Sequence, residues 1–237
     1  RETSEGIVAS AINSAKNGAA IVEISCETDF VARTDDFRAF AQQLADQAAA
    51  EPSVATLDEF TARPFAGGEG TIAEAVKAIV GKLGENMNVR RVEKFDIGAG
   101  SGAANYIHPG DKLGVLVEFS GVSDPNGAAF KELARDVAMH IAATGPQAIT
   151  RDDVDQSVIN KEREIYRQQA LNEGKPEKIV DRIVEGKIDK FYSEITLTEQ
   201  AFVKDPDMTV GELLKSKTAE VGDGLAVSRF ARYRLGE

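Results

Sequence analysis

The sequence has one cysteine and no long apolar run, and each shortage excludes a class of protein. Cys26 alone cannot form a disulfide framework within the chain, and this scarcity is typical of a reducing compartment. No apolar run approaches the roughly 18 residues that a membrane-spanning helix needs, and the N-terminal segment RETSEGIVAS lacks the apolar core of a signal peptide. We therefore expect a cytoplasmic protein that does not contact a membrane.

Catalytic signatures are also scarce. The chain contains two histidines, His108 and His140, and no H-E-x-x-H motif, and a single cysteine cannot build a zinc site of its own. The glycine-rich stretches 67–70 and 98–102 lack the Lys-Ser/Thr of a phosphate-binding loop, so both are predicted to be ordinary loops. We predict no catalytic residue, no metal site and no cofactor.

The charge balance points to a protein partner. The chain has 39 acidic and 28 basic residues, which gives a formal net charge of −11. Such a charge disfavours direct binding to nucleic acid or to an anionic membrane surface. With 237 residues, the chain is long enough to bury a substantial core in one large domain or two small ones.

One structural unit occurs twice. Residues 21–25 read IVEIS and residues 116–120 read LVEFS, and each follows a predicted hairpin whose turn contains glycine. A helix-period apolar stripe then begins at Phe37 in the first copy and at Phe130 in the second, and each copy closes with another helix and a strand. This order predicts an α+β fold of two repeated subdomains, each a three-stranded antiparallel sheet covered by helices.

The second copy contains an insertion that the first copy lacks. Apolar residues at alternating spacings of three and four predict two helices over 153–173 and 177–194, with Gly174-Lys175-Pro176 between them. We predict an antiparallel coiled-coil hairpin. The predicted segments are an N-subdomain of residues 1–98, a C-subdomain of residues 99–149 and 197–237, and a hairpin of residues 150–196.

One loop differs from an ordinary connection. Residues 26–33 follow a central strand, form the longer of the two equivalent loops, and place Phe30 and Val31 in polar surroundings. The residues allow two interpretations of Phe30. It is either a plug for the core or an exposed wedge for a partner, because aromatic anchors dominate the energetics of many interfaces.

The sequence resembles the elongation factor Ts family over nearly its whole length. The resemblance is carried, in the family's order, by residues 26–33 (CETDFVAR), 84–92 (GENMNVRRV), 113–117 (LGVLV), 139–143 (MHIAA) and 174–176 (GKP). It implies a guanine-nucleotide exchange factor for elongation factor Tu that performs no covalent chemistry. Family members begin with a small helical domain, and this chain is expected to start after it.

The resemblance also implies two contacts with the GTPase. In the first, Phe30 enters the nucleotide domain between helices, Asp29 makes polar contacts there, and the elements that hold Mg²⁺ and the phosphates are displaced. The residues implied in this contact are Thr28, Asp29, Phe30 and Val31. The residues implied in a second contact, with another domain, are Leu113, Gly114, Met139 and His140. His140 also fits a structural role, packed on its own subdomain.

The coiled-coil hairpin is open to several interpretations. The resemblance offers a homodimer or a 2:2 complex formed through it, or a contact with the partner, while the residues alone also fit a solvated arm. A scaffolding protein that assembles through the hairpin and has no exchange activity is therefore the alternative function. An enzyme with an unrecognised site is a third, weakly supported by two isolated histidines.

Overall fold

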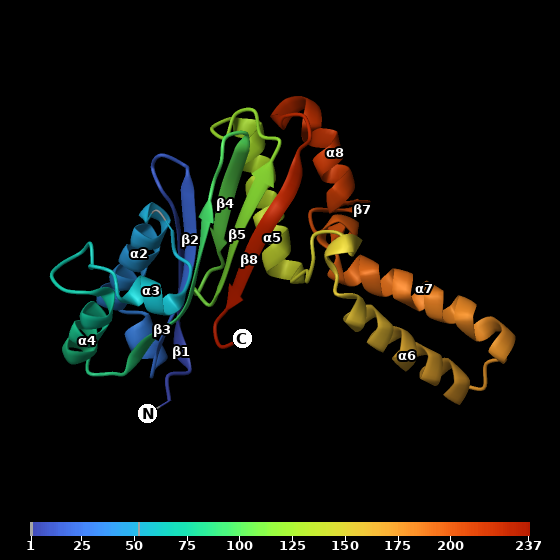
Figure 1. Ribbon diagram of the computed structural model, residues 1–237, viewed down its shortest axis with the longest axis horizontal. Coiled ribbons are helices and arrows are strands. Elements are labelled where there is room, and N and C mark those ends of the chain that lie inside the picture. The colour runs from blue at the N-terminus through green and yellow to red at the C-terminus, as the bar shows by residue number, and fades with distance from the viewer. Residues whose placement is uncertain (1, 52) are drawn as a thin grey trace. The chain divides into compact units, whose positions relative to one another are not determined.

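The repeated unit is present as two sheets with the same connectivity. The computed structural model describes residues 2–51 and 53–237, and it confirms the predicted α+β fold. In each sheet the first two strands form a hairpin and the third strand pairs antiparallel with the second (Figure 1). The first sheet contains β1 (Glu5–Ile12), β2 (Gly18–Cys26) and β3 (Met87–Asp96); the second contains β4 (Ser101–Ile107), β5 (Leu113–Ser120) and β8 (Ala226–Arg234).

Helices connect the second and third strands of the first sheet. Their ends are marked in the sequence: Thr71 and Glu74 form a reciprocal capping box at the start of α4, and Gly84 ends it in the left-handed conformation with φ 76°. The helices are α1 (Asp29–Ala32), α2 (Asp35–Ala50), α3 (Leu57–Thr61) and α4 (Ile72–Leu83). The apolar stripe of α2 packs on β1 and β2, as its spacing predicts.

The second sheet is covered by α5 (Ala128–Thr144), the counterpart of α2. Phe130, Leu133, Val137 and Ile141 of its predicted stripe are buried. The ring of Phe130 meets that of Phe119 on β5 edge to face, with centroids 5.5 Å apart. The two copies of the repeat therefore build their cores in the same way.

The two sheets pack against each other through their remaining faces. Because strand side chains alternate between faces, each sheet has a second apolar set that its helices do not cover. Burial of these sets joins the copies into one folded unit. The buried members of this cluster are Val8, Ala19, Ile21, Phe95, Ile97, Leu116, Ala231 and Tyr233.

A buried ion pair within the first sheet also contacts the second sheet through its arginine. Glu23 on β2 is 3% exposed and accepts a hydrogen bond from Nε of Arg91 on β3 at 2.6 Å. The guanidinium of Arg91 lies 4.0 Å from the ring centroid of Tyr233, and its Nη2 donates to the carbonyl of Arg234 at 2.9 Å. One arginine thus neutralises a buried carboxylate and contacts the other sheet.

The second copy repeats this arrangement in the opposite direction. Glu118 and Arg229, which occupy the equivalent positions of the repeat, form the second pair. The guanidinium of Arg229 lies 4.2 Å from the centroid of Phe95 on the first sheet, and its Nη2 donates to the carbonyl of Asp96 at 2.9 Å. The contact between the sheets is therefore self-complementary, like a two-fold interface between identical subunits. We call these two groups the Glu–Arg latches.

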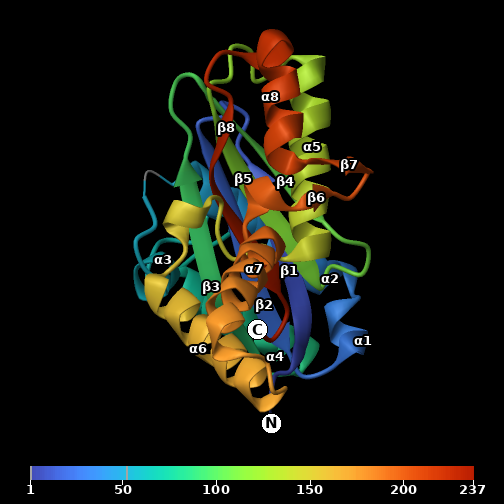
Figure 2. The same ribbon diagram turned by 90° about the vertical axis from the view of Figure 1, so that its right-hand side faces the viewer.

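The predicted helical hairpin lies in a separate compact unit. The chain divides into residues 1–142 with 217–237, and residues 143–216. In the second unit α6 (Gln156–Asn172) and α7 (Glu177–Ile195) pack antiparallel around Ile159, Val180, Val184 and Ile188 (Figure 1 and Figure 2). Arg163 with Glu185 and Arg167 with Asp181 form ion pairs along them.

This unit also contains a short two-stranded sheet that the sequence did not suggest. Its strands are β6 (Ala201–Phe202) and β7 (Asp205–Thr209), and two 3₁₀ turns, η1 (Arg151–Asp153) and η2 (Leu197–Glu199), flank the hairpin. The chain then continues into α8 (Val210–Val221) before β8. This division reflects the contacts within each unit. It does not test the predicted boundaries of the N-subdomain, the C-subdomain and the hairpin, which remain a prediction. In the parts of the chain that the structure describes, no helix is both long and apolar enough to span a membrane.

The latches generate a stability prediction. Arg91→Ala leaves Glu23 buried without its cation, and we expect the free energy of unfolding to fall by about 2–4 kcal/mol, since the arginine itself is partly exposed. Chemical denaturation measures this loss. The double variant Glu23→Ala/Arg91→Ala is expected to lose less than the sum of the two single variants.

Lys82→Ala is the matched control, because the pair of Lys82 with Asp36 is largely exposed and its removal is expected to cost below about 1 kcal/mol. Equal losses for Arg91→Ala and Lys82→Ala would show that the latch contributes no more to stability than an exposed ion pair.

Candidate functional site

The loop singled out in the sequence starts from a rigid base. Every residue of β2 is buried, so the position of Cys26 at its end is fixed by the core. The Cys26 thiol donates to the carbonyl of Thr28 at 3.2 Å, and burial raises the pKa of this thiol to about 11. At neutral pH the thiol is therefore protonated and has a structural role. We refer to residues 26–33 as the Phe30 loop.

A carboxylate from another part of the chain holds the Phe30 loop. Glu85 accepts hydrogen bonds from the backbone N–H of Thr28 at 3.0 Å and from its hydroxyl at 2.6 Å. The same hydroxyl accepts from the N–H of Val31 at 3.4 Å and so caps α1. Glu27 in turn accepts from the N–H of Asn86 at 3.0 Å. We call these bonds the Glu85 clamp.

The clamp depends on how α4 ends. Gly84 adopts the left-handed conformation, which a glycine adopts without strain, and the chain turns there from α4 into β3. Glu85 and Asn86 occupy this turn, so the helix end determines where the Glu85 carboxylate lies. Glu85 lies in the stretch 84–92 that carries the family resemblance, but the sequence assigned it no role, because its partner Thr28 is 57 residues away and no spacing rule connects them.

The clamp leaves one apolar side chain in solvent. Phe30 is 82% exposed, whereas the other large apolar side chains on the surface are 37% to 44% exposed. Its neighbours anchor α1 from the other side, since Ala32 is buried and Val31 packs against the core between α2 and the first sheet. Asp29 lies beside Phe30 and pairs with Arg33 at 3.1 Å. This placement excludes the core-plug interpretation of Phe30.

The second set of predicted site residues lies mostly inside the protein. Leu113 and Met139 are half-buried, whereas Gly114 and His140 are buried. A Cβ atom on Gly114 would approach Cγ1 of Val8 to 2.6 Å, so glycine is required there by the close packing of β1. Leu113 and Met139 are thus the members of this set whose side chains reach the surface.

The turn between β4 and β5 connects the region of Leu113 to the region of the Phe30 loop. The N–H of Val8 on β1 donates to the carbonyl of Asp111 in this turn at 2.7 Å, and α1 also packs on β1. Arg38, in the first turn of α2, forms an ion pair with the Asp111 carboxylate at 2.9 Å. The turn next to Leu113 and Gly114 is therefore held against β1 and α2, and α1 of the Phe30 loop packs on β1 as well.

The turn also contains His108, which sequence reasoning placed in no site. Its Nδ1 lies 3.0 Å from the hydroxyl of Tyr106 on β4, and the imidazole is exposed. Within residues 2–51 and 53–237, no group of three or more His, Cys, Asp or Glu side chains is placed to hold a metal ion. The features that distinguish the Phe30 loop are the exposed ring of Phe30 and the fully buried strand β2 that precedes it.

Comparison with known proteins places these features in a family. The family model described as elongation factor TS matches residues 27–237. The chain is 46% identical over 237 residues to elongation factor Ts of Clostridium botulinum (strain Alaska E43 / Type E3), covering all of this chain and 77% of that protein. It is 45% identical over 238 residues to elongation factor Ts of Clostridium tetani (strain Massachusetts / E88), again covering all of this chain and 77% of the relative.

The Glu85 clamp predicts local order that one substitution removes. Glu85→Ala deletes the acceptor of two hydrogen bonds to a carboxylate, each of which contributes about 1–3 kcal/mol. We expect the amides of residues 28–33 to exchange hydrogen with solvent at least about tenfold faster, as measured by NMR. Glu85→Gln, which keeps an acceptor, is expected to show a smaller change.

Glu74→Ala serves as the control, because it breaks the capping box of α4 and leaves the Phe30 loop untouched. Unchanged protection of residues 28–33 in Glu85→Ala would mean that the clamp does not order the loop.

Proposed function

Because the chain belongs to the elongation factor Ts family, whose members exchange guanine nucleotide on elongation factor Tu without covalent chemistry, we propose that Phe30 is the wedge that opens the GTPase. The single observation that carries this proposal is the 82% exposure of Phe30 on a helix fixed from below. A soluble protein gains nothing in stability from such a side chain. A partner that buries it gains about 1.5–3 kcal/mol.

The proposed contact is favourable because the Phe30 loop is ordered before binding. Thr28 is fixed by the Glu85 clamp, and Val31 and Ala32 by the core, so little conformational entropy is lost when a partner receives the ring. Asp29 presents a carboxylate beside Phe30 for polar contacts in the nucleotide domain. Insertion of the ring separates the elements that hold Mg²⁺ and the phosphates, which carry much of the affinity for GDP.

Thermodynamic linkage makes the proposed effect reciprocal. If this chain weakens GDP binding by a given factor, GDP must weaken binding of this chain by the same factor. GDP leaves the complex, a new nucleotide enters, and the nucleotide then displaces this chain. Exchange is thus a cycle of competing complexes, and this chain needs no reacting group of its own.

The exchange factor is also proposed to make a second contact with elongation factor Tu. In this proposal the surface around Leu113 and Met139 touches another domain of elongation factor Tu, and the buried Gly114 and His140 shape that surface from beneath. The hydrogen bond from Val8 to Asp111 and the Arg38–Asp111 ion pair join this surface to the base of the Phe30 loop. A rigid connection of this kind lets force at one contact act at the other.

The α6–α7 hairpin is proposed to bring two copies together, as a homodimer or within a 2:2 complex. Val158 and Ile165 lie seven residues apart on α6 and are 37% and 39% exposed, so they share one face of the helix. Leu171 and Ile179 add exposed apolar surface near the end of the hairpin. The chain is proposed to act in the cytoplasm, where translation takes place, and its single cysteine agrees with that compartment.

The wedge is tested by release of a fluorescent GDP analogue from elongation factor Tu in stopped flow. This chain is expected to accelerate release, and Phe30→Ala is expected to reduce the acceleration at least about tenfold, the loss that corresponds to burial of one phenyl ring. The stability of Phe30→Ala is expected to stay within about 0.5 kcal/mol of the parent, because the ring is exposed.

Val203→Ala is the matched control, since Val203 is also exposed and has no proposed role. Full acceleration by Phe30→Ala would remove the wedge from Phe30. No acceleration by the parent chain would contradict the proposed function itself.

Assembly through the hairpin is tested with Ile165→Lys. If the apolar face of α6 pairs two copies, light scattering after gel filtration gives a dimer mass for the parent and a monomer mass for the variant. Lys178→Glu, which changes charge on α7 without removing apolar surface, is expected to remain dimeric. A monomer mass for the parent at every concentration would contradict assembly through the hairpin.

A further inference from the structure

The outer edge of β4 has no strand hydrogen-bonded to its backbone, although the Asn105 side chain donates to the hydroxyl of Ser10 on β1 at 2.8 Å. β4 lies at the end of the second sheet and pairs only with β5. Within the described residues, no backbone hydrogen bond joins β4 to any other strand. Its sequence, SGAANYI, contains no charged residue and no proline, the devices that commonly prevent an edge strand from pairing with another chain.

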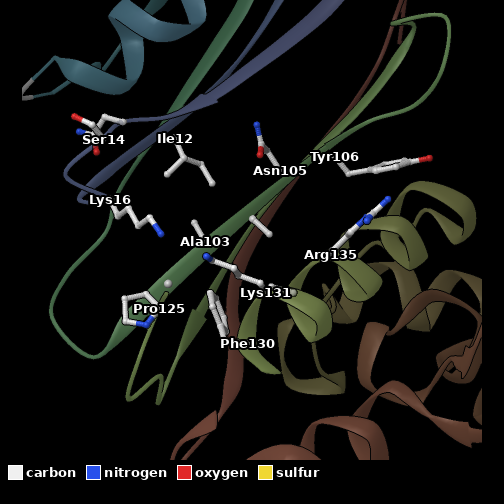
Figure 3. Close-up of a pocket in the computed structure, with 14 residues that line it drawn as sticks. Ile12, Ser14, Lys16, Ala103, Asn105, Tyr106, Pro125, Phe130, Lys131 and Arg135 are labelled. Atoms are coloured by element: carbon white, nitrogen blue, oxygen red, sulfur yellow. The ribbon is translucent and has the colours of Figure 1, made fainter. Parts of the chain in front are cut away.

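A groove follows this edge. It has a volume of about 460 Å³ and is lined by the turn between β1 and β2, by β4, and by the N-terminal half of α5 (Figure 3). All residues from Gly102 to Tyr106 line it. Because successive strand residues point to opposite faces, a groove lined by consecutive residues must lie along the strand edge rather than over one face. We call it the β4 groove.

The charge of the β4 groove is opposite to that of the whole chain. Lys16, Lys131 and Arg135 line it and no acidic residue does, although the net charge of the chain is −11. In the described parts of the chain, Lys131 and Arg135 take part in no ion pair, and Lys16 is hydrogen-bonded to the neutral Asn126. Figure 3 shows Lys16 and Lys131 approaching Ala103 from different elements, with Arg135 nearer to Tyr106.

The floor of the groove is apolar. Phe130 is buried beneath it, and its ring would lie 2.6 Å from a Cβ atom on Gly102, so the absence of a side chain at Gly102 leaves the ring close to the strand. Ile12 and Ala103 add half-buried apolar surface. Free backbone groups, an apolar floor and three cations therefore occur together in one place.

We propose that the β4 groove binds an extended acidic segment of a partner protein, which adds to β4 as a further strand. Backbone hydrogen bonds to the free edge provide affinity, and alternate side chains provide selectivity. The apolar side chains of the segment contact the apolar floor of the groove, and its carboxylates pair with the cations that line it, Lys16, Lys131 and Arg135. The surface is separate from the Phe30 loop, so a bound segment gives the protein a second partner or a second tether.

The binding test uses a fluorescein-labelled, acetylated peptide of alternating glutamate and valine, three of each, in fluorescence anisotropy. Saturable binding is expected for the parent, and Lys131→Glu/Arg135→Glu is expected to weaken it at least tenfold. Lys77→Glu/Lys82→Glu on α4 makes the same change in net charge away from the groove and is expected to retain binding. Phe30→Ala is also expected to retain it.

The mode of binding is tested by hydrogen exchange. Amides of residues 102–106 that do not bond to β5 are expected to become protected when the peptide is present. The proposal is overturned if binding is absent up to about 1 mM, if both double variants weaken it equally, or if the β4 amides stay unprotected. Tighter binding of oligothymidylate than of the peptide would assign the groove to nucleic acid and would likewise overturn it.

Discussion

Two buried glutamates, each neutralised by an arginine that crosses to the other sheet, are the constraint on which the molecule depends. Glu23 and Glu118 lie in the middle strands of their sheets, where an unpaired carboxylate would be strongly destabilising. Arg91 and Arg229 each pair with the glutamate of their own sheet, and each also donates a hydrogen bond to a backbone carbonyl of the other sheet. The copies therefore cannot separate without exposing apolar surface and breaking both latches. The same sheet contact buries Val8 of β1, the strand on which α1 packs.

The functional surface combines rigidity with exposure. Phe30 lies on a helix of four residues, which has little stability alone, and the Glu85 clamp and the buried Ala32 supply the missing order. The result is an aromatic ring held in solvent at a defined position. Such an arrangement does not stabilise the free protein, so its physical rationale lies in the complex. Membership of the elongation factor Ts family gives that complex a GTPase as its second component.

The sequence predicted the parts of the structure that repeat with a period. The stripes that start at Phe37 and Phe130 locate α2 and α5, and the alternating spacing after Thr150 locates the helical hairpin. The latches and the Glu85 clamp were not predicted, because their partners are far apart in sequence. The short β6–β7 sheet was missed because β6 has only two residues and β7 contains a proline and two aspartates, which are uncommon in strands. Phe30 alone shows no period, so its exposure could be learned only from the structure.

The Glu85 clamp is proposed to act on nucleotide exchange through Phe30, and a double-mutant cycle tests this coupling most directly. Rates of GDP release from elongation factor Tu are measured with the parent, Glu85→Ala, Phe30→Ala and the double variant. If the clamp serves only to position the ring, Glu85→Ala slows exchange when Phe30 is present and adds nothing when it is absent. Equal effects of Glu85→Ala in both backgrounds would contradict the account, because Glu85 would then act independently of Phe30.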